Sequence, residues 1–85
     1  MKKLRAILGF NVKYYRFLNK MTQEKLAEKC NLSPRYISDI ENAKGNISID
    51  TVSDIANALK VDPYLLFKEK KDKELLKRVN MINKK

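Results

Sequence analysis

The sequence predicts an all-α protein, a compact five-helix domain followed by a basic tail, and three observations support this. Its 85 residues, 44% of them hydrophobic, are enough for one domain with one core. Only two Gly and two Pro are present, so the regularly spaced turns of an all-β fold are missing. Apolar residues instead recur every three or four positions, which is the period of an amphipathic helix.

The first two helices follow from this spacing. Residues 4–18 form the first predicted helix, whose apolar positions are Leu4, Leu8, Val12 and Tyr15. Thr22 can then cap a second helix of about eight residues, because its hydroxyl accepts hydrogen bonds from free backbone amides. The inward face of this second helix consists of Leu26, Ala27 and Cys30.

A three-residue break, 31–33, separates the second helix from the third. Asn31 tolerates the left-handed conformation that ends a helix, and Leu32 is an apolar plug. Ser33 and Pro34 are the preferred cap and first residue of a new helix, since proline lacks a donor that this position does not need. The third helix is therefore expected over residues 34–42, with Ile37 and Ile40 facing inward.

Two further helices complete the predicted domain, residues 1–67. Ser48 can cap a fourth helix, whose inward residues are Val52, Ile55, Ala56 and Leu59. Asp62 and Pro63 repeat the start signal for a fifth helix. The remaining residues, 68–85, form a basic tail that is compatible with a further helix, because Leu75, Val79 and Ile82 keep helical spacing.

The charge of the chain favours a polyanionic partner. The net charge is +9 and the pI is about 9.8, and more than half of the positive excess lies in residues 68–85. A single cysteine and no histidine make a metal site or an internal disulfide unexpected. No stretch suits a signal peptide or a membrane span, so a cytoplasmic protein without membrane attachment is expected.

Two short helices joined by a three-residue turn form the motif that places its second helix in the major groove of DNA. Here these helices are residues 22–30 and 34–42. The residues that carry a family resemblance are Val12-Lys13, Arg16, Met21-Thr22-Gln23-Glu24, Leu26-Ala27, Leu32-Ser33, Ile37-Ser38, Ile40-Glu41-Asn42, Ile55-Ala56 and Ala58-Leu59.

In this order and spacing the chain, over residues 9–67, resembles the Cro/repressor-type, XRE-like helix-turn-helix family of bacterial and phage transcriptional regulators. Residues 35–41 together with 46–49 look most like the controller proteins of restriction-modification operons. The resemblance implies a sequence-specific regulator that binds double-stranded DNA as a homodimer, on a palindromic operator with half-sites about 34 Å apart.

The resemblance also implies which residues read bases, namely Ser33, Pro34, Arg35, Ser38 and Asp39. Arg35 is the strongest candidate, because arginine can donate two hydrogen bonds to guanine. Asp39 has two interpretations that the sequence leaves open. It accepts from cytosine, or it pairs with Arg35 one helical turn away.

Contacts to the phosphate backbone are implied for Gln23, Tyr36, Asn42, Lys44 and Asn46. Gln23 stands at the start of the second helix, where backbone amides favour an anion, although a helix-start residue without a ligand is the alternative. Tyr36 either packs over the turn or reaches a phosphate or sugar, and packing is slightly favoured.

Scaffold and dimer roles are implied in the same way. Arg16 and Glu41 match a partly buried salt bridge that ties the first helix to the third. The dimer contact of the family corresponds here to the fifth helix, with Tyr64, Leu65, Leu66 and Phe67.

Two departures from the family pattern stand out. Ala43 occupies the place of a glycine that ends the third helix, so Gly45 is an alternative position for the left-handed turn. Phe10, Phe17 and Leu18 add apolar surface to the first helix, which either the tail or a second subunit must cover.

Rival functions are weaker. The alternative function is that of an antitoxin-like protein, which would bind DNA and also bind a partner protein through the tail. An enzyme is disfavoured, because no nucleophile with a base, phosphate-binding loop or metal set can be assembled and no cofactor is expected. RNA binding is disfavoured because the chain lacks the cluster of aromatic residues on which bases stack. Membrane binding is disfavoured because acidic residues are interspersed in the tail.

Overall fold

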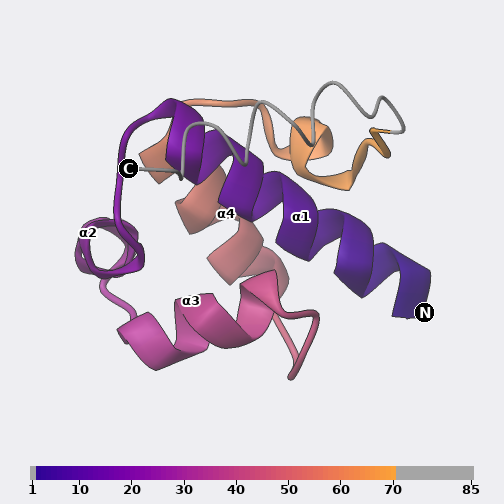
Figure 1. Cartoon of the computed structure of the whole chain (residues 1–85), viewed down its shortest axis with the longest axis horizontal. Coiled ribbons are helices and arrows are strands. Elements are labelled where there is room, and N and C mark those ends of the chain that lie inside the picture. Colours follow the sequence, from indigo (N-terminus) through magenta and orange to yellow (C-terminus); the bar gives the residue numbers. More distant parts are fainter. Residues whose placement is uncertain (1, 71–85) are drawn as a thin grey trace.

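The computed structural model describes residues 2–70, which form four α-helices and one short 3-10 helix (Figure 1). In chain order these are α1 (Lys2–Leu18), α2 (Gln23–Cys30), α3 (Pro34–Glu41), α4 (Ile49–Leu59) and η1 (Pro63–Phe67). Within this range the backbone contains no β-strand, so the all-α prediction is confirmed. The amphipathic tail predicted from Leu75, Val79 and Ile82 lies outside the described residues.

Hydroxyl caps start three of the helices where the sequence predicted them. The Oγ1 atom of Thr22 and the Oγ atoms of Ser33 and Ser48 each accept a hydrogen bond from the backbone amide three residues later, at 3.0 Å in every case. These bonds satisfy donors that the first turn of a helix otherwise leaves free. The three-residue turn of the helix-turn-helix is present between Cys30 and Pro34.

The predicted fifth helix begins at Pro63 as expected, but it is not an α-helix. The segment Pro63–Phe67 is a 3-10 helix, and Asp62 makes no side-chain cap bond to it. The amide of Leu65 donates instead to the carbonyl of Asp62 at 3.0 Å, a bond across three residues that tightens the turn. This short element is nevertheless held firmly, because the side chain of Leu66 is fully buried.

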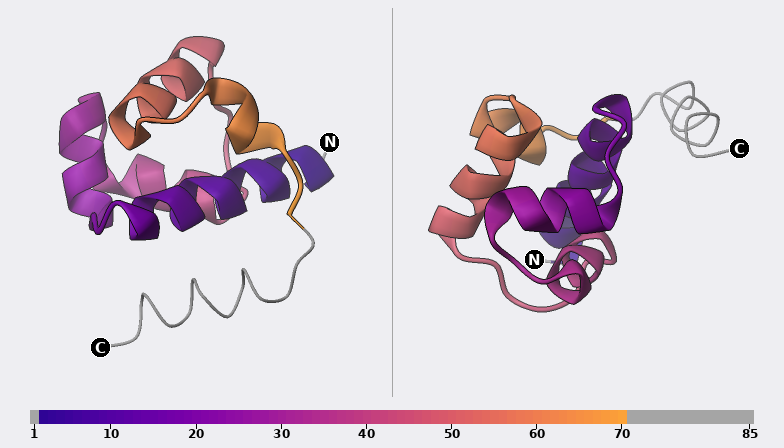
Figure 2. Two further views of the ribbon diagram at one scale, coloured as in Figure 1. Left: turned by 90° about the horizontal axis from the view of Figure 1, so that it is seen from above. Right: turned by 90° about the vertical axis from the view of Figure 1, so that its left-hand side faces the viewer.

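One core joins all five elements. Helix α1 crosses α3 on one side and η1 on the other, and α2 packs against both α3 and α4 (Figures 1 and 2). The buried core residues are Leu8, Val12, Leu26, Ala27, Cys30, Ile37, Ile40, Val52, Ile55, Ala56, Leu59 and Leu66. Leu4 was predicted to lie on the apolar face of this helix but is not part of the core, because it lies in the first turn of α1 and is 46% exposed.

Asn11 is a core residue that the sequence analysis missed. Its side chain is fully buried, and its Nδ2 atom donates to the carbonyl oxygens of Leu66 at 2.8 Å and Lys68 at 3.0 Å. A buried amide is costly unless its groups are bonded, and here the Oδ1 atom has no partner among the described residues, so only the two donor bonds offset that cost. These two bonds fix η1 and the residue after it against α1.

The additional aromatic residues of α1 form a second cluster. Tyr14 and Phe17 are buried, with Phe10 and Tyr15 packed against them. The Nζ atom of Lys70 lies 5.4 Å and 4.8 Å from the ring centroids of Tyr14 and Tyr15, within range of a cation–π contact. The structure therefore places Phe17 in a cluster separate from the main core, while Leu18 is 47% exposed.

The helix ends use left-handed residues other than glycine. Lys20, Asn31 and Lys60 have φ angles of 56°, 59° and 62°, so the prediction for Asn31 is confirmed. Ala43 also takes this conformation, with φ at 61°, and Gly45 follows with φ at 74°. The position of Ala43 therefore keeps the left-handed turn without its glycine, and Gly45 adds a second one.

Candidate nucleic-acid interface

The turn before α3 and the first turn of α3 form an exposed polar edge. Ser33, Pro34 and Arg35 are exposed, whereas Ser38 and Asp39 one turn later are half-buried. Ile37 and Ile40 point the other way, into the core. The helix therefore presents its polar face to solvent, as a helix that enters a DNA groove must.

Arg35 and Asp39 are neighbours on this edge. The Nε atom of Arg35 lies 3.7 Å from Oδ1 of Asp39, and the Arg35 side chain is 87% exposed. An exposed pair at this separation adds little stability, because water screens it. The pair with Arg35, one of the two interpretations of Asp39, is thus present as a loose contact, whereas the acceptance from cytosine stays a prediction.

Arg16 and Glu41 form the expected buried ion pair between α1 and α3. The Nε atom of Arg16 lies 2.7 Å from Oε2 of Glu41, its Nη2 atom donates to Oε1 at 3.0 Å, and its Nη1 atom donates to the carbonyl of Met21 at 2.9 Å. The exposed fractions of the two side chains are 8% and 3%. Two parallel bonds of this kind fix both position and orientation.

Gln23 belongs to the same network. Its Nε2 atom donates to Oε1 of Glu41 at 3.0 Å, which holds the amide at the first turn of α2. An amide group carries two N–H donors, so this bond leaves one available. The arrangement suits an anion, because the free backbone amides of a helix start favour negative charge at the same place.

The loop between α3 and α4 is tied at Asn46. The hydroxyl of Tyr36 donates to the Asn46 carbonyl at 2.9 Å, and Nη2 of Arg5 donates to the Asn46 side-chain oxygen at 2.8 Å. Tyr36 also packs against the core, as the favoured interpretation predicted. Arg5 was missed, because no local pattern links residues 41 positions apart.

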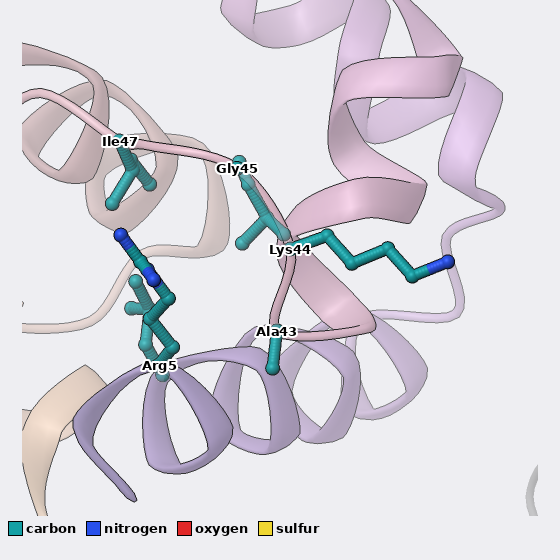
Figure 3. A pocket seen from close by; sticks show the side chains of 7 residues that line it. Arg5, Ala43, Lys44, Gly45 and Ile47 are labelled. Carbon is teal, nitrogen blue, oxygen red and sulfur yellow. The ribbon is translucent and has the colours of Figure 1, made fainter. Parts of the chain in front are cut away.

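Figure 3 shows this loop around a small hollow above α1. Arg5 rises from α1 toward Ile47, and the methyl group of Ala43 points down to the helix. The side chain of Lys44 extends away from the hollow, and its backbone amide donates to the Asp39 carbonyl at 2.8 Å. Lys44 therefore presents its charge to solvent.

Asn42, another candidate for a contact with the DNA backbone, lies at the end of α3. Its Nδ2 atom lies 3.4 Å from the Ser38 hydroxyl oxygen, and the residue is exposed. The candidates from Gln23 to Asn46 thus come from the starts of α2 and α3, the end of α3 and the loop that follows.

The candidate dimer residues divide into two groups. Tyr64 is 66% exposed, Phe67 is 36% exposed and Leu65 is half-buried. Leu66 is fully buried in the core of its own chain, so its assignment to a dimer surface is corrected. Its neighbours Tyr64 and Phe67 remain available because a tight 3-10 turn points them outward.

Two kinds of feature are absent from residues 2–70. This part of the chain has no group of three or more residues placed to hold a metal ion. None of its helices has the length and hydropathy needed to cross a membrane.

A short helix, a three-residue turn and a second helix with a polar exposed face define the chain as a helix-turn-helix protein. It belongs to the helix-turn-helix family, whose sequence profile matches residues 12–66. This family is one of DNA-binding transcription regulators rather than enzymes.

Similar proteins agree with this assignment. The control protein C.BamHI of Bacillus amyloliquefaciens is 43% identical over 61 residues, which is 71% of this chain and 75% of that protein. A Neisseria meningitidis hypothetical transcription factor is 36% identical over 63 residues, and the match spans 59% of its length.

Solved structures show the same architecture. The hypothetical transcription factor NHTF from Neisseria superposes with a TM-score of 0.77 and 33% identity, covering 92% of this chain and 88% of that one. The restriction-modification controller protein C.Esp1396I, a tetramer in complex with its natural 35 base-pair operator, has a TM-score of 0.68 and 34% identity, with 91% and 95% covered.

Proposed function

We propose that this protein is a transcriptional regulator that binds a palindromic operator in double-stranded DNA as a homodimer. The observation that carries this proposal is the exposed first turn of α3, where the Arg35 side chain is 87% exposed and held only by a loose pair with Asp39. Relatives named as control proteins and as an immunity repressor support it.

In this proposal, α3 enters the major groove and Arg35 reads guanine, with Ser33, Pro34, Ser38 and Asp39 at or next to the bases. A bidentate arginine contact is worth about 1–3 kcal/mol of discrimination. Ser33 keeps its oxygen engaged as the helix cap, so its hydroxyl hydrogen is the donor left for DNA.

The remaining candidates position the protein on the backbone. Gln23 offers its second amide N–H to a phosphate while Glu41 holds the first. Asn42 contributes from the end of α3, and Lys44 and Asn46 from the loop. Tyr36, in the first turn of α3, donates its hydroxyl hydrogen to the Asn46 carbonyl and would have to leave it to reach a phosphate. Contacts of this kind fix the register of the protein on the duplex and carry no sequence information.

Dimerisation is proposed to use the outward side of η1, formed by Tyr64, Leu65 and Phe67. Large apolar side chains that stand exposed together mark interaction surfaces. A two-fold dimer places two α3 helices on half-sites about one turn of DNA apart. The DNA-binding domain is proposed to comprise residues 1–67, in a cytoplasmic protein that acts by binding and needs no cofactor.

The experiment is a binding titration on DNA fragments from the region upstream of the gene, followed by footprinting of the bound site. Arg35→Ala should lose the preference for the operator over its single-base variants. Gln23→Ala should weaken binding to all sequences alike. The control is Lys29→Ala, because this residue is exposed at the far end of α2. Equal discrimination by wild type and Arg35→Ala would remove Arg35 as the reader.

A further inference from the structure

The α3–α4 loop is fixed at its two ends, where the Lys44 amide bonds to the Asp39 carbonyl and Ile47 packs against the core, while its middle has no packing partner. A Cβ atom built on Gly45 would meet no atom within 4 Å, so the middle of the loop stands in open space. The hollow beneath it, lined by residues that include Leu8, Ile40 and Ile47, has room for about one water molecule. Fixing this loop therefore depends on individual contacts on either side of Gly45.

Asn46 receives two of these contacts from two different helices. Tyr36, on α3, bonds its backbone carbonyl at 2.9 Å, and Arg5, on α1, bonds its side-chain oxygen at 2.8 Å. The first bond holds the chain, whereas the second fixes the orientation of the Asn46 amide. Once Oδ1 accepts from Arg5, both N–H donors of Asn46 face away from the guanidinium group.

We propose that Arg5 is a positioning residue, which acts through Asn46 to hold the α3–α4 loop in the form that binds DNA. This inference rests on the proposed function and deepens it. Arg5 presets the donor group of Asn46, so that less order is lost when the loop meets a phosphate.

The first test is a double-mutant cycle on operator affinity, measured by fluorescence anisotropy with wild type, Arg5→Met, Asn46→Ala and the double variant. Arg5→Met is expected to weaken binding by about 3–10-fold, the range for loss of one hydrogen bond. In the Asn46→Ala background the same substitution should have almost no further effect. The control, Lys13→Met, removes an equal charge from α1, where the lysine lies over the Phe17 ring instead.

The salt dependence of binding separates positioning from direct contact. A residue that acts through Asn46 leaves the slope of log affinity against log salt as in wild type, apart from the small common effect of net charge shown by Lys13→Met. A direct phosphate contact lowers the slope by about 1 when it is removed. Additive losses in the cycle, together with a reduced slope, would overturn the proposal and make Arg5 a phosphate ligand.

A second readout needs no DNA. Hydrogen exchange of the loop amides from Lys44 to Ile47 should become several-fold faster in Arg5→Met, and stay unchanged in Lys13→Met, while thermal unfolding shows that both variants are folded. Unchanged exchange would also overturn the proposal. If the wild type binds no operator, the proposed function fails, and the exchange result still decides whether Arg5 fixes the loop.

Discussion

Gly9 on α1 lies directly against the carbonyl oxygen of Ile40 on α3. A Cβ atom added at Gly9 would be 2.5 Å from this oxygen and 2.9 Å from the carbonyl oxygen of Glu41. Backbone atoms cannot rotate aside as a long side chain can, so the two helices would have to separate. The absence of a side chain at this one position sets how closely α1 approaches the end of α3.

Gly9→Ala is therefore expected to destabilise the protein, although alanine favours helix more than glycine. Overpacking lowers the free energy of unfolding by about 1–3 kcal/mol, and the higher helix propensity of alanine offsets about 1 kcal/mol of this loss. Urea denaturation followed by circular dichroism measures the difference. Ala6→Gly, at an exposed position of the same helix, calibrates the propensity effect alone. A Gly9→Ala protein more stable than wild type would contradict the close approach.

Ala43→Gly should act in the opposite direction. Ala43 has a φ of 61°, a conformation that costs a residue with a Cβ atom about 1–2 kcal/mol. Glycine removes this strain but gains freedom in the unfolded chain, so the net increase in stability is at most about 1 kcal/mol. The same denaturation assay applies, with Ala43→Val as the destabilised comparison. Lower stability of Ala43→Gly would show that the Ala43 methyl contact with α1 outweighs the strain.

The Arg16–Glu41 pair should show strong non-additivity. Removing one partner leaves an unpaired buried charge, so Arg16→Met or Glu41→Leu is expected to cost about 3–5 kcal/mol. The double variant should lose less than the sum, because it buries no charge at all. Denaturation of the four proteins at neutral pH measures the coupling. Simple addition of the two losses would mean that the pair is solvated and not buried.

The dimer proposal predicts that Tyr64→Asp yields a folded monomer. Tyr64 is 66% exposed, so the substitution leaves the core intact while it adds a charge to the outward side of η1. Sedimentation velocity at micromolar concentration should then give a monomer, with operator affinity reduced at least 10-fold. Asn57→Asp, exposed on α4, adds the same charge elsewhere. A Tyr64→Asp protein that still dimerises would move the interface away from η1.

Cys30 gives a prediction for pH. Burial raises the pKa of its thiol, and the negative charge of Asp54 adds to this effect. The unfolded chain therefore loses the thiol proton at a lower pH than the folded chain does, and the contribution of Cys30 to stability disappears as the pH rises through this interval. The stability difference between wild type and Cys30→Ala should shrink between pH 7 and pH 10. A constant difference would contradict the raised pKa.

The elements that the sequence predicts well depend on a few neighbouring residues. Thr22, Ser33 and Ser48 cap helices because a hydroxyl needs only the backbone three residues ahead. Asp62 and Pro63 carry the same signal, but without a cap bond the segment closes as a 3-10 turn. Local chemistry thus predicts where an element begins better than which kind of helix it becomes.

The tertiary contacts of the site were harder to predict. The Arg16–Glu41 pair was found only through resemblance to a family, and the contact of Arg5 with Asn46 was not found at all. Leu66 was assigned to a surface, because spacing alone does not tell which side of a short turn meets the core. These features depend on how α1 lies across α3 and η1, which no stretch of sequence encodes by itself.

The shared carboxylate of Glu41 restricts how this sequence can drift. It serves Arg16 through both oxygens and Gln23 through one, so a single substitution at any of the three positions disturbs the other two. Replacing Arg16 and Glu41 by two apolar residues requires two substitutions, and the protein with only one of them would fold poorly. Among descendants of this chain the three positions should therefore be inherited together or replaced together, and rarely change one at a time.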